Sequence, residues 1–279
     1  MEIKLLALDL DGTLLNESNT VSVENAEAVQ KARKQGVKIC ICTGRVNCET
    51  EYAAVQLGGC DYLITCNGSS VYDVQNRQHL YINLFPYSLC DRVIDVLDYF
   101  GMFYQIYVDD AVCCPAKLYN DFFKAPLNKE YMHMFSDSQV LLENPRVDVV
   151  EKKLDVFKFY IPNYDKELIS RLRRKVSAIS GVEVTYSSPY SIEVFQSGMD
   201  KLNGLTRLVD HLGMGFDNVM MIGDSENDFQ VIKAAKYGVA MGNAERYIQD
   251  AACMVTKTYK ESGVAHAVNE LILKPLGAL

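Results

Sequence analysis

The sequence lacks the features that define several large classes of protein. No stretch approaches the roughly 18 uninterrupted apolar residues that cross a membrane, and residues 1–4 lack the basic start of a signal peptide. There is no Walker P-loop and no G-x-G-x-x-G motif, and no internal repeat or low-complexity segment is evident. We therefore expect a cytoplasmic globular protein with no membrane partner, outside the nucleotide-binding classes that those two motifs define.

Cysteine and histidine also lack the patterns of a metal site. The nine cysteines include no C-x-x-C pair, and the four histidines are scattered along the chain. In a chain without a secretory signal, such cysteines are expected to be small buried hydrophobic residues. The sequence therefore predicts no disulfide framework and no histidine metal site.

Positive charge is scarce, and the formal net charge is −8. This balance argues against general nucleic-acid binding, which needs a basic face. The dense basic stretch at residues 171–175 is expected to be the solvated face of a helix, with nucleic-acid contact as the second interpretation. A protein this acidic that handles an anionic substrate must supply positive charge locally, from a few residues or from a metal.

Six short apolar runs have the length and composition of buried strands, and helical patterns lie between many of them. The runs are residues 3–8, 37–42, 62–66, 219–222, 238–241 and 253–256. The helical patterns are residues 22–35, 202–212, 226–236, 244–251 and 262–273. Strands that alternate with helices predict an α/β fold, a Rossmann-like parallel sheet with helices on both faces.

The middle of the chain has a different pattern. Aromatic and β-branched residues alternate in strand-like segments at residues 103–109, 154–162, 182–187 and 191–196. A helical pattern at 165–178 lies among them, and nine of the eleven phenylalanines fall between residues 85 and 195. We interpret the aromatic density as core packing in preference to ligand stacking. The sequence predicts a core domain of residues 1–84 and 197–279, interrupted by an α+β insertion of residues 85–196.

Polar groups follow three of the apolar runs at the point where each run ends. They are Asp9 and Asp11 after the first run, Thr43, Gly44 and Arg45 after the second, and Asp224, Asn227 and Asp228 after the fourth. Positions two apart in a strand share a face, so Asp9 and Asp11 can point the same way. Ligands of open α/β sheets bind outside the carboxyl ends of the strands. One acidic strand end is typical of a turn or a helix cap, but three of them favour a site.

Carboxylates gathered in one place repel one another and need a cation. All-oxygen ligands from a few aspartates suit Mg²⁺, which keeps waters and shares its shell with substrate phosphate. The glycine position and the ligand ladder of an EF-hand are missing. The sequence therefore indicates Mg²⁺ as the cofactor.

Four short motifs resemble those of the haloacid dehalogenase superfamily, in the same order. They are "DLDGT" (9–13), "CTGR" (42–45), Lys201 and "GDSEND" (223–228). The segments "TCNGSSVYD" (65–73), "GVAMGNA" (238–244) and "ESGVAHAV" (261–268) further resemble the Cof-type hydrolases, which carry a large α/β cap between the second and third motifs. The resemblance covers most of residues 1–82 and 197–273, and it implies that the insertion is a cap that sets substrate specificity.

The resemblance implies a role for each aspartate of the first motif. Asp9 would be the nucleophile that forms an aspartyl-phosphate. Asp11 would protonate the leaving alcohol and then take a proton from the attacking water. Mg²⁺ would be held by Asp9, by the backbone carbonyl of Asp11 and by Asp224.

The resemblance also implies a phosphate-binding set. Phosphoryl oxygens would be held by Thr43, the Gly44 backbone and Lys201, with Asn227 in phosphate or substrate contact. Asp228 would support the metal or Lys201.

Several residues of these motifs have a simpler alternative. Thr43 can be a residue of a turn at the end of a strand, and Lys201 a surface lysine before a helix. Ser225 and Asn227 can cap the helix that follows. Arg45 can be a surface residue or a salt-bridge partner, and it is not assigned to the site.

The sequence departs from the family pattern beside Lys201. The family commonly has glycine directly after this lysine, whereas here Leu202 follows and the nearest glycine is Gly204. The departure affects the local backbone and therefore the reach of the Lys201 side chain. The ammonium group of Lys201 is still present.

Together these features predict a Mg²⁺-dependent phosphatase that acts on a small phosphorylated metabolite, such as a sugar phosphate or a phosphorylated cofactor. The first alternative is a phosphohexomutase-like phosphoryl transferase, which a phosphate-release assay would separate. The second is a non-catalytic ligand-binding protein on the same fold, which metal-dependent turnover of any phosphate ester would exclude.

Overall fold

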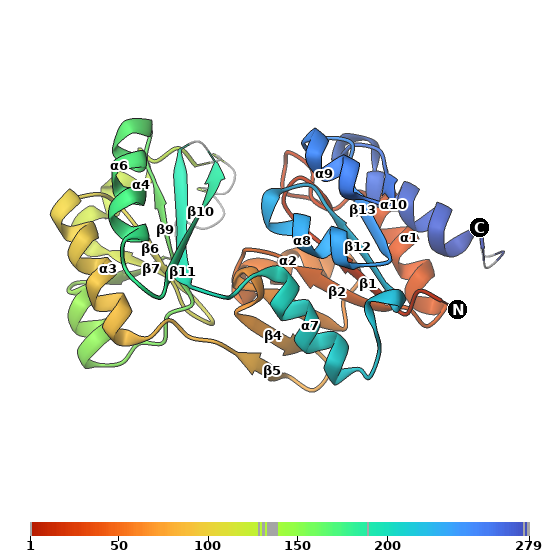
Figure 1. Ribbon diagram of the computed structural model, residues 1–279, viewed down its shortest axis with the longest axis horizontal. Coiled ribbons are helices and arrows are strands. Elements are labelled where there is room, and N and C mark those ends of the chain that lie inside the picture. Colours follow the sequence, from red (N-terminus) through yellow and green to blue (C-terminus); the bar gives the residue numbers. More distant parts are fainter. Residues whose placement is uncertain are drawn as a thin grey trace. The chain divides into compact units, whose positions relative to one another are not determined.

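The chain divides into two compact units in a computed structural model (Figure 1), which describes residues 2–127, 129, 132, 139–188, 190–275 and 277. Met1–Ile82 and Asp200–Leu279 form one unit, here called the core unit. Asn83–Met199 form the other, here called the inserted unit. The boundaries fall after residues 82 and 199, where the sequence predicts them after residues 84 and 196.

The described part of the core unit is built on one eight-stranded sheet. Its strands, in spatial order, are β14 (Met254–Val255), β13 (Tyr237–Ala240), β12 (Val219–Gly223), β1 (Leu5–Leu8), β2 (Lys38–Cys42), β3 (Tyr62–Thr65), β4 (Ser70–Asp73) and β5 (Gln78–Ile82). The strands from β14 to β3 pair in parallel, whereas β4 is antiparallel to both β3 and β5. All six predicted strands are present, and a hairpin that the sequence did not predict extends the sheet.

Helices lie on both faces of this sheet, as predicted for an α/β fold (Figure 1). Among the described residues they are α1 (Val23–Lys34), α2 (Asn47–Gln56), α7 (Lys201–His211), α8 (Glu226–Ala234), α9 (Arg246–Ala251), α10 (Gly263–Val268) and the short turn η7 (Asn269–Leu273). The side chain of Ser22 accepts a hydrogen bond from the backbone N–H of Asn25 and caps α1.

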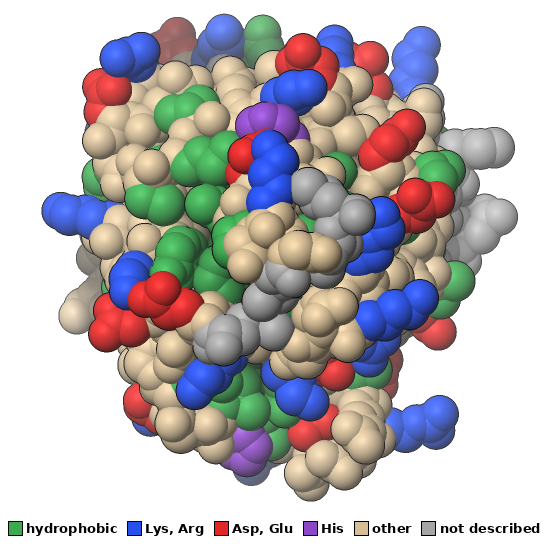
Figure 2. Space-filling view, turned by 90° about the vertical axis from the view of Figure 1, so that its right-hand side faces the viewer, with side chains coloured by type: hydrophobic (Ala, Val, Ile, Leu, Met, Phe, Trp, Pro, Cys, Tyr) green, Lys and Arg blue, Asp and Glu red, His purple; other side chains and the backbone are tan. Residues whose placement is uncertain are grey.

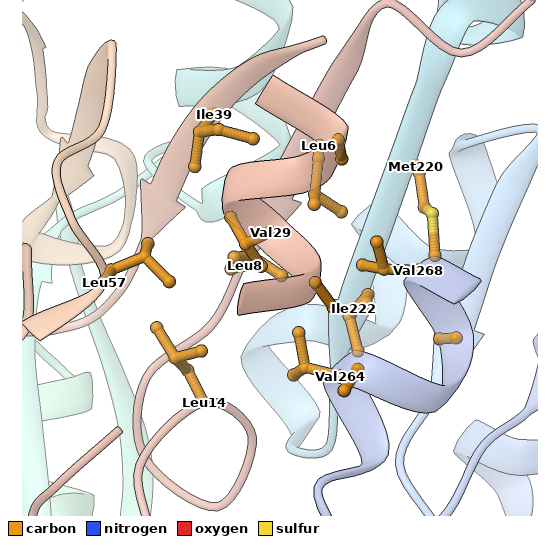
Figure 3. Close-up of a cluster of buried hydrophobic side chains, with 14 of the residues drawn as sticks. Leu6, Leu8, Leu14, Val29, Ile39, Leu57, Met220, Ile222, Val264 and Val268 are labelled. Carbon is orange, nitrogen blue, oxygen red and sulfur yellow. The ribbon is translucent and has the colours of Figure 1, made fainter. Parts of the chain in front are cut away.

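Successive side chains of β1 belong to two different hydrophobic cores, because strand residues alternate between faces. Leu6 and Leu8 pack with Val29 of α1 and with residues of α10, as Figure 3 shows. Leu5 and Ala7 pack on the opposite face, with residues of α7 and α8. The central strands are buried on both faces, so their polar groups can lie only where the strands end.

The inserted unit has its own sheet and its own core. Among its described residues the strands, in spatial order, are β10 (Val182–Ser188), β11 (Ser191–Gln196), β9 (Lys158–Pro162), β6 (Gln105–Tyr107), β7 (Val112–Pro115) and β8 (Gln139–Leu142). The helices are α3 (Tyr87–Phe100), α4 (Tyr119–Phe122) and α6 (Lys166–Ser177). The neighbouring strands are antiparallel, except that β7 and β8 are parallel. Residues of α3 and α6 pack on one side of this sheet, so the insertion is an α+β unit with an independent core.

Two exposed cysteines correct an expectation from the sequence. Cys48 and Cys253 are exposed, so the expectation that all nine cysteines are buried is wrong; both lie near the end of an element, outside the buried strands.

The basic residues of α6 at positions 171, 174 and 175 are exposed, as the sequence predicts, while Leu172 is buried. Acidic and basic side chains are interspersed on the face shown in Figure 2. No described helix is long and apolar enough to cross a membrane.

Candidate active site

The carboxyl ends of three adjacent parallel strands of the core unit bring together the residues of three predicted motifs. Asp9 directly follows β1, Thr43 follows β2 and Asp224 follows β12. The backbone N–H of Asp9 donates to Ile222 (3.0 Å) and that of Thr43 to Ile64 (2.8 Å), so each residue continues the hydrogen bonding of the neighbouring strand. The side chains therefore leave the sheet along one edge, where ligands of such sheets bind.

Lys201 lies at the centre of the buried charges. Its Nζ donates to Asp9 Oδ1 (2.6 Å) and to Asp228 Oδ1 (2.7 Å), and its side chain is fully buried. The surface-lysine alternative is therefore wrong. Burial alone would lower the pKa of Lys201, but the charges of Asp228 and Asp9 raise it above its usual range, so the ammonium stays charged.

The position of Lys201 depends on a close approach of two backbones. Lys201 is the first residue of α7, which Asp200 caps by accepting a hydrogen bond from the backbone of Asn203 (2.7 Å). A Cβ at Gly68, in the short turn η1 (Cys66–Gly68), would lie 2.0 Å from the Asp200 carbonyl oxygen. A Cβ at Gly204 would lie 2.7 Å from the Cα of Gly68. This chain therefore needs its glycine at position 204, and Lys201 reaches the site with leucine at position 202.

Asp228 anchors the loop between β12 and α8. Its Oδ2 accepts hydrogen bonds from the backbone N–H groups of Asp224 and Ser225 (3.1 Å each), while its Oδ1 accepts from Lys201. Ser225 and Asp228 form a capping box at the start of α8. The helix-cap alternative is therefore right for Ser225, and the buried Asp228 links that cap to Lys201.

Asp224 is held by two neutral donors. Thr13 Oγ1 donates to its Oδ1 (3.1 Å), and Asn243 Nδ2 donates to its Oδ2 (3.2 Å) and to the carbonyl of Gly12 (2.9 Å). Gly12 has φ +77°, and a Cβ there would lie 2.4 Å from Asp224 Oδ2. Glycine is therefore required at position 12. Asn243 was not predicted as a site residue, although it lies in the segment "GVAMGNA".

The acidic side chains Asp9, Asp224 and Asp228 form a cluster that could hold a metal ion. Each offers one carboxylate oxygen, and these oxygens lie within 4.8 Å of one another. Three carboxylates and the single ammonium of Lys201 leave a formal charge of −2 (−3 plus +1) in a largely buried space. Burial, together with neighbouring carboxylates, raises the pKa of Asp9 well above its ordinary value and that of Asp224 to about 6. A divalent cation would therefore balance the formal charge of the cluster.

Thr43, Gly44 and Asn227 meet at Asn67, which sequence reasoning missed. Asn227 Nδ2 donates to Asn67 Oδ1 (3.0 Å), and a Cβ at Gly44 would lie 3.1 Å from the same oxygen. The backbone N–H of Asn67 donates to the carbonyl of Thr43 (3.1 Å). Asn67 has φ +53° and lies in the segment "TCNGSSVYD". Thr43 Oγ1 accepts from the backbone N–H of Arg45 (3.2 Å), a local contact typical of a turn at the end of a strand, and the phosphate-binding role of Thr43 stays a prediction.

Arg45 is the partner of Asp11. Its Nε donates to Asp11 Oδ2 (2.8 Å) and its Nη2 to Asp11 Oδ1 (2.5 Å), which makes a two-oxygen ion pair. Nη2 also donates to Asn19 Oδ1 (3.1 Å), and Nη1 to the Tyr52 hydroxyl (2.6 Å). The Arg45 side chain is 10% exposed and that of Asp11 59%. The salt-bridge alternative for Arg45 is therefore right, and its partner is a predicted catalytic residue.

Comparison with known proteins identifies the family of this chain. The family model described as haloacid dehalogenase-like hydrolase matches residues 6–268. A 5-amino-6-(5-phospho-D-ribitylamino)uracil phosphatase of Bacillus subtilis is 32% identical over 98% of this chain and 97% of its own length. The pyridoxal phosphate phosphatase YbhA of Escherichia coli is 29% identical over 91% of this chain and 93% of its own.

A solved structure of a haloacid dehalogenase-like hydrolase from Bacteroides thetaiotaomicron superposes with a TM-score of 0.83, at 26% identity, over 97% of this chain and all of that one. The chain belongs to the haloacid dehalogenase-like hydrolases. The predicted superfamily, its Cof-type phosphatase group and the fold class are confirmed, and the names of the relatives support phosphoric monoester hydrolysis as the activity.

Proposed function

We propose that this protein is a Mg²⁺-dependent phosphatase that hydrolyses a small phosphorylated metabolite through an aspartyl-phosphate on Asp9. The observation that carries the proposal is the buried cluster of Asp9, Asp224 and Asp228, whose formal charge Lys201 balances only in part. The names of two relatives give phosphorylated ribitylaminouracil and pyridoxal phosphate as their substrates, which favours a small phosphorylated metabolite of this kind.

The donor set fits Mg²⁺, which prefers oxygen ligands. Asp9, Asp224 and the backbone carbonyl of Asp11 would hold it. Asp228 is better assigned to support, because both of its oxygens already accept hydrogen bonds from Lys201 and from the start of α8. When bound, the ion supplies positive charge between the carboxylates and the phosphoryl oxygens, which would otherwise repel one another.

In the first step, an oxygen of Asp9 attacks phosphorus and the bond from phosphorus to the ester oxygen breaks. Lys201 orients Asp9 by holding its Oδ1 (2.6 Å). Asp11 gives a proton to the leaving alcohol. Thr43, the Gly44 backbone, Lys201 and Asn227 hold the phosphoryl oxygens while charge redistributes on them.

The test is a phosphate-release screen over phosphorylated metabolites that includes ribitylaminouracil phosphate, pyridoxal phosphate and a series of sugar phosphates. We expect turnover with Mg²⁺, none after exhaustive metal removal with EDTA, and none for Asp9→Asn under either condition. Full turnover without metal, or isomerised hexose phosphate with no release of phosphate, would contradict the proposal.

A further inference from the structure

The ion pair between Asp11 and Arg45 joins an exposed side chain to a buried one. The Arg45 side chain is 10% exposed, while that of Asp11 is 59% exposed. A buried guanidinium with several hydrogen bonds keeps its orientation, whereas an exposed carboxylate can rotate at little cost. Arg45 is therefore the fixed member of the pair.

Two neutral side chains fix Arg45 independently of Asp11. The hydroxyl of Tyr52 accepts from Nη1 (2.6 Å), and Asn19 Oδ1 accepts from Nη2 (3.1 Å). Tyr52 lies on α2, and Asn19 lies in a turn with φ +53°, where its backbone N–H donates to the carbonyl of Asn16 (3.0 Å). These contacts orient the guanidinium edge toward Asp11 from two separate elements.

The pair engages Asp11 as an ionised carboxylate, the form in which it can act as a base. Both of its oxygens face N–H donors of Arg45, at 2.8 and 2.5 Å. An acid must instead turn one oxygen, with its proton, toward the leaving group. The observed arrangement therefore suits the base of the second step better than the acid of the first.

We propose that Arg45 is a positioning residue that holds Asp11 for hydrolysis of the aspartyl-phosphate, and from which Asp11 turns away to protonate the leaving group. This inference rests on the proposed function. In the second step water attacks phosphorus and its proton passes to the Asp11 carboxylate. The bond from phosphorus to the Asp9 oxygen breaks, which releases inorganic phosphate and restores the Asp9 carboxylate.

The test separates the two steps with a radioactive aryl phosphate in the presence of Mg²⁺. Its leaving group needs little protonation, so formation of the phosphoenzyme depends little on Asp11 as an acid. Rapid quenching gives the rate constant of formation, and a chase with unlabelled substrate gives that of decay. The variants are Arg45→Gln, which removes the two-oxygen pair, and Tyr52→Phe, which removes one of the groups that fix the guanidinium.

We expect Arg45→Gln to slow the decay about tenfold or more while formation changes less than about twofold. Tyr52→Phe should act in the same direction but less strongly, and because it keeps the ring it remains informative if Arg45→Gln does not fold. A merely structural role would reduce the active fraction and leave both rate constants of the surviving enzyme unchanged. Decay at the wild-type rate in both variants, or equal slowing of both steps, would overturn the inference.

Arg33→Gln is the matched control, because Arg33 forms a partly exposed ion pair with Asp61 (3.3 Å) in the same unit. It removes the same charge and should change neither rate constant. Asp11→Asn separates this inference from the function on which it rests. If Asp11→Asn accumulates label and the Arg45 and Tyr52 variants do not slow decay, only the inference fails; if Asp11→Asn forms no label, the aspartyl-phosphate itself is contradicted.

Discussion

Asp224 is the residue at which the charge balance of the site can be measured. Burial, followed by the charge of Asp228, raises its pKa from an ordinary 3.8 to about 6 in the metal-free protein. Between these values the folded protein keeps a proton that the unfolded chain has lost. The resulting stabilisation is fully present below about pH 4 and is lost as the pH rises through about 6; its size is of the order of 3 kcal/mol.

We therefore expect Mg²⁺ to raise the melting temperature far more at pH 7.5 than at pH 5. At pH 5 the ion must displace protons from Asp224, whereas at pH 7.5 it relieves repulsion between carboxylates. Thermal unfolding with Mg²⁺ and with EDTA at the two pH values checks this. In Asp224→Asn most of the Mg²⁺ effect should disappear at both; an equal or larger Mg²⁺ effect at pH 5 in the wild-type protein would contradict the charge argument.

At the scale of single residues, the sequence indicated the residues that carry charge at the strand ends, but not the residues that orient them. Asn67 and Asn243 were missed, and Arg45 was considered as a salt-bridge partner but not assigned to the site. Asn67 contacts Asn227, which is 160 positions away, and Asn243 contacts Gly12, which is 231 positions away. Such roles depend on which loops the fold brings together. Local spacing contains no signal for them, although Asn67 and Asn243 lie in segments that the family resemblance marked.

At the scale of elements, the contact between α7 and η1 sets the position of Lys201. The added Cβ of Gly204→Ala would lie 2.7 Å from the Cα of Gly68 and 2.8 Å from Ile64 Cγ2. Alanine would favour the helix by about 1 kcal/mol, but overpacking costs about 1–3 kcal/mol. We expect a net loss of stability, measured by urea unfolding, together with a fall in phosphatase activity as α7 shifts.

Gly215→Ala is the matched control for this prediction. The nearest atom to its added Cβ is 4.0 Å away, and Gly215 has a negative φ (−109°) that alanine tolerates. We expect its stability to change by less than about 0.5 kcal/mol, with activity unchanged. Wild-type stability and activity in Gly204→Ala would show that the close approach does not position Lys201.

The helices show where sequence patterns succeed and where they fail. The buried residues of α3 (Cys90, Val93, Ile94 and Leu97) follow helical spacing, so that helix was predictable and was overlooked among the strand-like segments around it. On α2 the buried residues are Glu49, Thr50 and Ala53. No apolar stripe marks that helix, because two of these buried residues are polar, and the charge of one of them, Glu49, acts on Arg45. The sequence pattern could therefore not reveal it.

At the scale of the whole molecule, we propose that selectivity between substrates resides in residues 85–196. The core motifs are assigned to the phosphoryl group and the metal, which all phosphate esters share, so discrimination must come from contacts with the rest of the substrate. We expect replacement of this insertion by that of a relative to change the ranking of substrates in a phosphate-release panel. Asp9→Asn in the chimera should abolish all turnover, and an unchanged ranking would contradict the proposal.

The central claim is that Asp9 and Asp11 act in succession, and labelling of the two variants tests it most directly. Asp9→Asn keeps the size of the side chain but removes the anionic nucleophile, so no phosphoenzyme should form. Asp11→Asn keeps Asp9 and the backbone carbonyl at position 11 but lacks the base for water. In a rapid quench with a radioactive aryl phosphate and Mg²⁺, we predict acid-stable, hydroxylamine-sensitive label in Asp11→Asn and none in Asp9→Asn; label on Asp9→Asn, or none on Asp11→Asn, would contradict the account.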